Sequence, residues 1–205
     1  MNPESMKSGS MKPMAAIIMA AGASSRFGGC KLLADVGGRP MLQQRIDLAG
    51  EWLPEDVYVV SGAWHQALMA AKGRGELSGA SFLYADRWSD GLAASLVTGI
   101  HALEADYAAV LVLLADQVAL ERRDLARLLV TFNQHNSDGH AIVCAFYQGR
   151  RGVPAIFGRK SFPRLKQLSG DQGAKAVLYE SAFPVYECPL PNAALDIDYR
   201  DQLTP

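Results

Sequence analysis

The chain lacks features that mark several classes of protein. Its net charge is −1, from 20 Lys and Arg against 21 Asp and Glu, so no excess of positive charge favours nucleic acid or a membrane surface as a partner. Its longest apolar runs, such as 107–115, are far shorter than the roughly 18 residues of a transmembrane helix. The four histidines show no HExxH or other metal-ligand spacing, and no GxSxG motif is present.

Cysteine is also scarce. Cys30, Cys144 and Cys188 are far apart, odd in number and in no CxxC pair. This pattern argues against a disulfide framework and against a zinc site. It favours a reducing, cytoplasmic location.

Length and composition favour one domain. The 205 residues are 49% hydrophobic and 20% charged, which is typical of a globular protein. Residues 1–13 are polar and without periodicity, and we expect a disordered leader or a cloning remnant there. Lys7 and Lys12 before the apolar stretch 14–23 resemble a signal peptide only superficially, because cleavage near Ala23 would remove the first strand. Residues 14–205 are expected to form a single domain.

Short apolar segments alternate with segments of helical character along the chain. The expected strands are 15–19, 57–61, 81–84, 110–114, 142–146 and 185–188, with a further short one at 155–157. The expected helices are 40–49, 64–71, 92–103, 121–133 and 173–181. This alternation predicts an α/β fold, a three-layer α/β/α sandwich with a mostly parallel, Rossmann-like sheet. Ligands of such folds bind at the carboxyl ends of the strands.

The segment 20–31, AAGASSRFGGCK, directly follows the first expected strand. Successive backbone N–H groups in such a small, Gly- and Ser-rich loop bind anions, and Arg26 and Lys31 add positive charge. The loop therefore predicts a polyphosphate site, with an ordinary βα turn as the alternative. The GxxxxGK[ST] motif needs Lys directly after its second glycine, whereas Lys31 comes two residues after Gly29, and GxGxxG is absent.

Carboxylates follow two other segments. Asp116 comes just after the apolar strand 110–114, where a charge is costly unless it has a function, and there it is well placed to hold Mg²⁺. The alternative is a cap for the helix that begins near 121. Asp196 and Asp198 fall on one face of an extended segment, opposite Ile197, and here a capped turn before a short helix at 200–203 is the favoured alternative.

Three more segments carry candidate ligand contacts. Gly91 and Ser95 follow the strand 81–84 and predict base or ribose contacts, with an ordinary helix start capped by Asp90 as the alternative. In 149–158, GRRGVPAIFG, two arginines at an expected turn could meet a phosphate or form a solvated surface pair. In 168–175, LSGDQGAK, Asp171 is expected to cap a helix.

The loop 20–31 resembles the AAGxSxRxGxxK signature of the nucleotidyltransferases (NTP transferases) typified by the molybdenum cofactor enzymes. The matching residues are Ala20, Ala21, Gly22, Ser24, Arg26, Gly28 and Lys31. Further elements occur in the order of that family, namely GLAASL at 91–96, LADQ at 114–117, RGVP at 151–154, GDQGA at 170–174 and DID at 196–198. The ordered set is most similar to the molybdenum cofactor cytidylyltransferases. Guanylyl-transferring relatives typically carry AGG rather than the AAG of 20–22, which favours cytosine.

The resemblance implies a sheet of the nucleotide-diphospho-sugar transferase type and attack of an acceptor phosphate on the α-phosphorus of a nucleoside triphosphate. The implied nucleotide-binding residues are Ala20, Ala21, Gly22, Ala23, Ser24, Ser25, Arg26, Lys31, Gly91 and Ser95. The implied catalytic residues are Lys31, Arg26 and Asp116, and the implied Mg²⁺ ligands are Asp116 and Asp198. The implied acceptor contacts are Arg151, Gly152, Pro154 and Asp171. CTP is the favoured donor, molybdopterin the favoured acceptor, and a molybdoenzyme the partner that would receive the product.

The chain departs from the family pattern around the expected acceptor site. Val118 replaces the Pro of LADQP, Val153 replaces the His of RGHP, and Tyr199 follows Asp198 where Thr-Pro is usual. Nucleotidyl transfer is therefore a stronger expectation than the identity of the acceptor. Guanylyl transfer, transfer to a sugar or alditol phosphate, and a non-catalytic cofactor carrier remain as alternatives.

Overall fold

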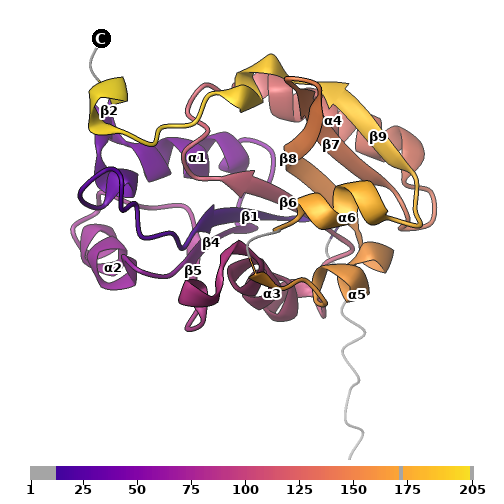
Figure 1. The fold of residues 1–205 in the computed structure, drawn as a ribbon, viewed down its shortest axis with the longest axis horizontal. Coiled ribbons are helices and arrows are strands. Elements are labelled where there is room, and N and C mark those ends of the chain that lie inside the picture. The colour runs from indigo at the N-terminus through magenta and orange to yellow at the C-terminus, as the bar shows by residue number, and fades with distance from the viewer. Residues whose placement is uncertain (1–12, 171–172, 204–205) are drawn as a thin grey trace, which may run out of the picture.

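A seven-stranded sheet forms the centre of the fold. The computed structural model describes residues 13–170 and 173–203 (Figure 1). The sheet has the order β5-β4-β1-β6-β8-β7-β9. The strands are β1 (Ala15–Ala20), β4 (Val57–Ser61), β5 (Ser81–Tyr84), β6 (Ala109–Leu114), β7 (Ile142–Tyr147), β8 (Arg150–Gly158) and β9 (Val185–Pro189). Each strand expected from the sequence is present, and 57–61 and 81–84 have the expected bounds.

The sheet is mostly parallel, as expected. β5, β4, β1 and β6 pair in parallel, β8 is antiparallel to both β6 and β7, and β9 is parallel to β7. β8 is antiparallel to β7 because a two-residue turn joins the two strands. Gln148 and Gly149 in this turn both have positive φ (50° and 71°). The connections between parallel strands are longer and carry helices.

The segment 149–158 corrects an expectation. Arg150 and Arg151 do not lie at a turn, because they begin β8, which is far longer than the expected 155–157. The strand accommodates a proline through an irregularity in its pairing with β7. Cys144 pairs with Ala155 and Ala145 pairs with Gly152, so Val153 and Pro154 have no partner residue in β7. Proline is tolerated at such a bulge because no ladder N–H is needed there.

Helices cover both faces of the sheet, which confirms the three-layer sandwich (Figure 1). The α-helices are α1 (Met41–Gly50), α2 (His65–Gly73), α3 (Leu92–Leu103), α4 (Arg122–His135), α5 (Phe162–Leu165) and α6 (Lys175–Glu180). Apolar residues of α1, α2 and α4 share one buried cluster with Ile18 of β1, and those of α3, α5 and α6 share another with Ile17. Alternate β1 side chains thus face opposite layers. No helix in the described ranges is long and apolar enough to cross a membrane.

Shorter elements are also present in the described ranges. A small hairpin, β2 (Asp35–Val36) with β3 (Arg39–Pro40), was not expected. The 3-10 helices are η1 (Lys31–Leu33), η2 (Trp88–Asp90), η3 (Arg159–Ser161), η5 (Pro191–Ala194) and η6 (Arg200–Leu203). η6 coincides with the short helix expected at 200–203.

Helix starts exclude two alternatives. α4 begins with a capping box between Glu121 and Asp124, so Asp116 is not its cap. α3 has the expected bounds, but its N-cap is Gly91, with φ of 107°, while Asp90 pairs with Arg87 at 2.7 Å.

The strand order reverses next to β1. From β1 the chain moves outward through β4 and β5, then returns to place β6 on the other side of β1. Met19 pairs with Leu114, so the two strands end at the same level. The segments that follow β1 and β6 therefore diverge from one crevice, which is where open α/β sheets bind ligands.

Candidate functional site

The loop after β1 has a backbone that turns tightly. Ser24 adopts a positive φ of 53° and Gly28 one of 74°. A non-glycine residue in this conformation is uncommon and marks a backbone held by its surroundings. Phe27 closes the turn by donating its N–H to the Ser24 carbonyl at 3.0 Å. Its side chain is buried beside Met41 and Ile197, which anchors the loop on the protein.

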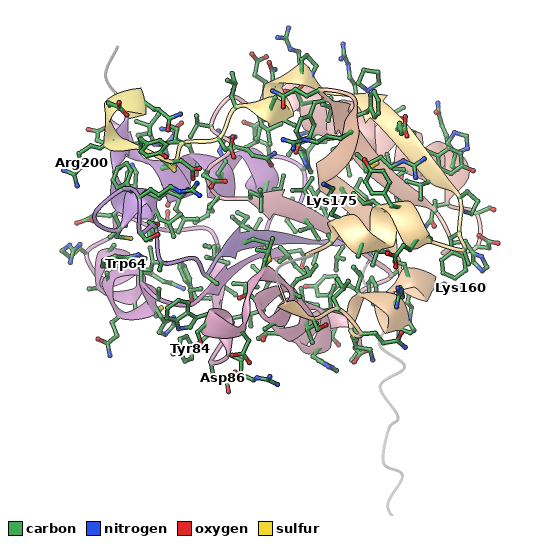
Figure 2. All side chains as sticks on the ribbon, viewed as in Figure 1. Trp64, Tyr84, Asp86, Lys160, Lys175 and Arg200 are labelled. Carbon is green, nitrogen blue, oxygen red and sulfur yellow. The ribbon has the colours of Figure 1, made fainter. Side chains whose placement is uncertain are left out.

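The segment after β4 holds the same loop from the other side. Ala63 donates its N–H to the Ala21 carbonyl at 3.1 Å, and Trp64 donates its indole N–H to the Ala23 carbonyl at 2.9 Å. A Cβ on Gly62 would lie 2.6 Å from the Ala21 carbonyl oxygen, so only glycine fits between the two segments. Trp64 is labelled in Figure 2. Sequence reasoning missed both Gly62 and Trp64.

Lys31 links the loop to both predicted metal carboxylates. Its Nζ donates to Asp116 Oδ2 at 2.7 Å, to the Ile197 carbonyl at 2.8 Å and to Asp198 Oδ1 at 3.4 Å. These contacts use all three hydrogens of the ammonium group. The Lys31 side chain is only 12% exposed, and Lys31 begins η1, next to the buried Leu32. Ion pairs shielded in this way are screened by salt less than surface pairs.

Arg26 supplies the second cation of the site. Its Nη1 lies 3.0 Å from Asp198 Oδ2, and its side chain is 66% exposed. The head group is therefore free to reach a ligand in the crevice, at the loss of a solvent-screened ion pair that contributes little. Asp198 thus contacts both cations, whereas Asp196 is exposed and makes no such contact in the described part of the chain.

One carboxylate oxygen at the centre of the site has no hydrogen-bond partner in the part of the chain that the structure describes. Asp116 Oδ1 is buried and accepts no hydrogen bond from the described residues. Leaving such an atom unpaired is costly, so it points to a bound group. Among the described residues no cluster of three or more His, Cys, Asp or Glu could hold a metal ion. Asp116 and Asp198 together still fit Mg²⁺, which takes one or two carboxylates and completes its shell with phosphates and water.

Two adjoining cavities bring together every residue expected to bind nucleotide. The first, about 380 Å³, is lined by Ala20, Ala21, Gly22, Ser24, Ser25, Arg26 and Lys31, with Asp116 and Asp198. The second, about 250 Å³, is lined by Ala21, Gly22, Ala23, Trp88, Gly91 and Ser95. They share Ala21, Gly22 and Leu92, so one elongated ligand could occupy both.

A third cavity, of about 260 Å³, shares Met19, Leu92 and Leu114 with the first. Besides apolar side chains it is lined by Tyr147, Arg150, Arg151, Gly152 and Lys175. Lys175, from the first turn of α6, is labelled in Figure 2. Of the residues expected to contact the acceptor, Arg151 and Gly152 line this cavity, Pro154 is buried in β8 instead, and Asp171 lies outside the described residues.

Arg151 is not freely solvated at this cavity. Its Nε donates to Glu187 at 2.7 Å, and Nη1 donates to the Leu178 carbonyl at 2.7 Å. The hydrogen bond that Arg151 donates to the Glu187 carboxylate raises the pKa of Arg151 above its usual value, which keeps the guanidinium charged. Arg150 packs its guanidinium over the Tyr147 ring at 5.6 Å. The cavity therefore combines apolar side chains with the cationic side chains of Arg150, Arg151 and Lys175.

Comparison with models of known protein families identifies the family of this chain. The family model described as MobA-like NTP transferase domain matches residues 16–185. The chain belongs to this family. The match covers the loop 20–31, Asp116 and the cavity residues Arg150 and Arg151 of this MobA-like NTP transferase. No curated protein matches it in sequence.

Solved structures agree on the fold. Rv0371c from Mycobacterium tuberculosis H37Rv has a TM-score of 0.79 at 23% identity, over 95% of this chain and 98% of that one. A complex of Rv0371c with manganese has a TM-score of 0.69 at 20% identity, over 89% and 90% of the two chains. Molybdopterin-guanine dinucleotide biosynthesis protein A from Archaeoglobus fulgidus has a TM-score of 0.67 at 14% identity, over 93% and 94%. The transferase therefore has the α/β fold expected from its sequence.

Proposed function

We propose that this MobA-like NTP transferase moves CMP from CTP onto a phosphate acceptor, molybdopterin, and releases pyrophosphate. One observation carries the proposal: the ammonium of Lys31 lies between Asp116 and Asp198 at the mouth of the glycine-rich loop. Transfer of a phosphoryl group depends on positioning and charge neutralisation. The crevice supplies both, because it brings together cations, loop N–H groups and a pair of carboxylates.

The cations have separate tasks in this proposal. The N–H groups of 22–25 and the exposed Arg26 hold the β- and γ-phosphates. Lys31 neutralises charge that develops on the α-phosphate and the leaving pyrophosphate. Its three hydrogen bonds to protein oxygens are exchanged for phosphate oxygens when the nucleotide binds.

Asp116 and Asp198 hold Mg²⁺ in this proposal. The buried Oδ1 of Asp116, which no described residue hydrogen-bonds, supports the assignment. A bound Mg²⁺ would supply charge neutralisation at the phosphate oxygens. The protein's own part is to fix the two carboxylates, through the end of β6 and through the backbone N–H of Ile197, which donates to the Asp116 carbonyl at 3.2 Å.

The acceptor occupies the cavity of about 260 Å³ beside the nucleotide site. Arg151 and Gly152 contact it there, and Pro154 and Asp171 are assigned to the same acceptor from the sequence alone. A phosphate monoester is already ionised at neutral pH, so the reaction needs no general base. The product would pass to a molybdoenzyme in the cytoplasm, a setting that suits the three free cysteines.

Other functions use the same site differently. Guanylyl transfer, or transfer to a sugar or alditol phosphate, would keep the chemistry and change the substrates. A carrier that hands over molybdopterin without catalysis would keep the pocket alone. The paired Lys31 and Asp116 argue against the carrier, because a carrier need not stabilise a leaving pyrophosphate.

Calorimetric titration with Mg²⁺–CTP and Mg²⁺–GTP tests the donor. Tight, metal-dependent binding of CTP, lost in Asp116→Asn, is expected. A clear preference for GTP would move the protein to guanylyl transfer, and binding of neither nucleotide would contradict the proposal.

A further inference from the structure

A buried arginine lies beneath the site. Arg45, on α1, is 5% exposed, and no carboxylate among the described residues accepts its hydrogen bonds. Burial lowers the pKa of its guanidinium to about 10. A buried cation without a counter-ion is costly, and an apolar side chain would fill this face of α1 at less expense. The buried charge of Arg45 therefore suggests a specific role for this side chain.

Among the described residues, every acceptor of an Arg45 hydrogen bond lies in the loop 117–120, directly after Asp116. Nη1 donates to the carbonyls of Gln117 at 2.8 Å and Leu120 at 3.2 Å. Nη2 donates to the Val118 carbonyl at 3.3 Å. The planar guanidinium can satisfy three carbonyls in a fixed geometry, which a lysine ammonium or an apolar side chain cannot do.

Gln117 extends this network to the segment that carries Asp198. Its side chain is 1% exposed, and Nε2 donates to the carbonyls of Val153 at 2.9 Å and Ala193 at 2.8 Å. The Ile197 N–H adds a second tie by donating to the Asp116 carbonyl. The segments that carry Asp116 and Asp198 are thus joined by hydrogen bonds through the loop 117–120, to which Arg45 donates.

We propose that Arg45 is a positioning residue that fixes the loop 117–120 and, through Gln117, the spacing of Asp116 and Asp198. The inference rests on the proposed function, since it assumes that the two carboxylates share a metal ion. Arg45 touches neither the nucleotide cavities nor the acceptor cavity. Arg45 affects metal affinity indirectly, by holding the backbone that carries the two carboxylates.

Two variants and a control test the role of Arg45. Arg45→Met removes every donor, and Arg45→Lys keeps the charge with fewer, differently placed donors. Arg122→Met is the control, because Arg122 lies on the neighbouring α4, pairs with Glu51 on the surface and is 65% exposed. Mn²⁺ binding is measured by electron paramagnetic resonance with a non-hydrolysable CTP analogue present. Analogue binding in EDTA and thermal unfolding are measured alongside.

We expect Arg45→Met to weaken Mn²⁺ binding about 10-fold or more, the range known for residues behind metal ligands. Arg45→Lys should lie between Arg45→Met and the wild type, and Arg122→Met should bind as the wild type does. Analogue affinity in EDTA should stay near the wild-type value in all three.

Several outcomes would overturn the inference. They are unchanged Mn²⁺ affinity in folded Arg45→Met, an equal loss of metal-free analogue affinity, or failure of both Arg45 variants to fold, which would make Arg45 a stability residue only. If the wild-type protein bound neither Mn²⁺ nor the analogue, the proposed function would fail first, and the inference with it.

Discussion

The Nζ of Lys31 lies 2.7 Å from Oδ2 of Asp116, and these two residues come from opposite sides of the crevice between β1 and β6. The ammonium also contacts Asp198 at 3.4 Å. It therefore occupies the space between the two carboxylates that the proposal assigns to Mg²⁺. A divalent cation and the Lys31 ammonium compete for the same carboxylate oxygens. Nucleotide phosphates that draw Lys31 away would leave those oxygens to the metal, so metal and nucleotide should bind more tightly together than separately.

Replacing Lys31 should separate catalysis from metal binding. Lys31→Met should lower turnover by about 100- to 1,000-fold, as removal of a preorganised charge-stabilising group usually does. The same variant should bind Mn²⁺ alone more tightly than the wild type, because the competing ammonium is gone. Steady-state rates and Mn²⁺ titration measure the two effects. Lys160→Met is the control, because Lys160 is exposed and lines none of the three cavities, and near-normal turnover of Lys31→Met would refute the assigned role.

Asp116→Asn should remove activity and its metal dependence together. The amide keeps the shape of the side chain but loses the charge that the cation requires. Rates measured across Mg²⁺ and Mn²⁺ concentrations check this, with Asp106→Asn, an exposed carboxylate, as the control. Full Mg²⁺-dependent activity in Asp116→Asn would show that the metal lies elsewhere.

Trp64→Phe should raise the KM for nucleotide with little change in kcat. The variant keeps an aromatic ring but loses the hydrogen bond to the Ala23 carbonyl, which is worth about 0.5–1.5 kcal/mol, or about 2- to 10-fold in affinity. Trp52→Phe is a matched control, because Trp52 Nε1 is buried with no partner in the described ranges. Equal effects of the two substitutions would show that the Trp64 N–H does not position the loop.

Gly62→Ala should destabilise the protein. Its new Cβ would lie 2.5 Å from the Cβ of Trp88 and 2.6 Å from the Ala21 carbonyl oxygen. Overpacking of this kind costs about 1–3 kcal/mol. Chemical denaturation measures the loss. Gly50→Ala, in α1 with open space around its Cβ position, should leave stability unchanged or slightly raised, and equal stability of the two variants would contradict the steric account.

Local patterns in the sequence predict the strands and the edge of the sheet at which Lys31 and Asp116 lie. Both residues follow apolar segments of a parallel sheet, and the carboxyl ends of such strands share one edge. The extension of β8 through Pro154 could not be predicted, because it depends on a bulge opposite Cys144 and Ala145 in another strand. Arg45 lies on an otherwise ordinary helix, and only the tertiary fold brings it to carbonyls more than 70 residues away.

The central claim is nucleotidyl transfer, and single-turnover release of pyrophosphate from Mg²⁺–CTP in the presence of molybdopterin tests it most directly. The account predicts pyrophosphate in proportion to the acceptor consumed, together with a CMP-linked product, and none from Lys31→Met on the same time scale. Binding of CTP and molybdopterin without release of pyrophosphate would contradict the account and favour a carrier.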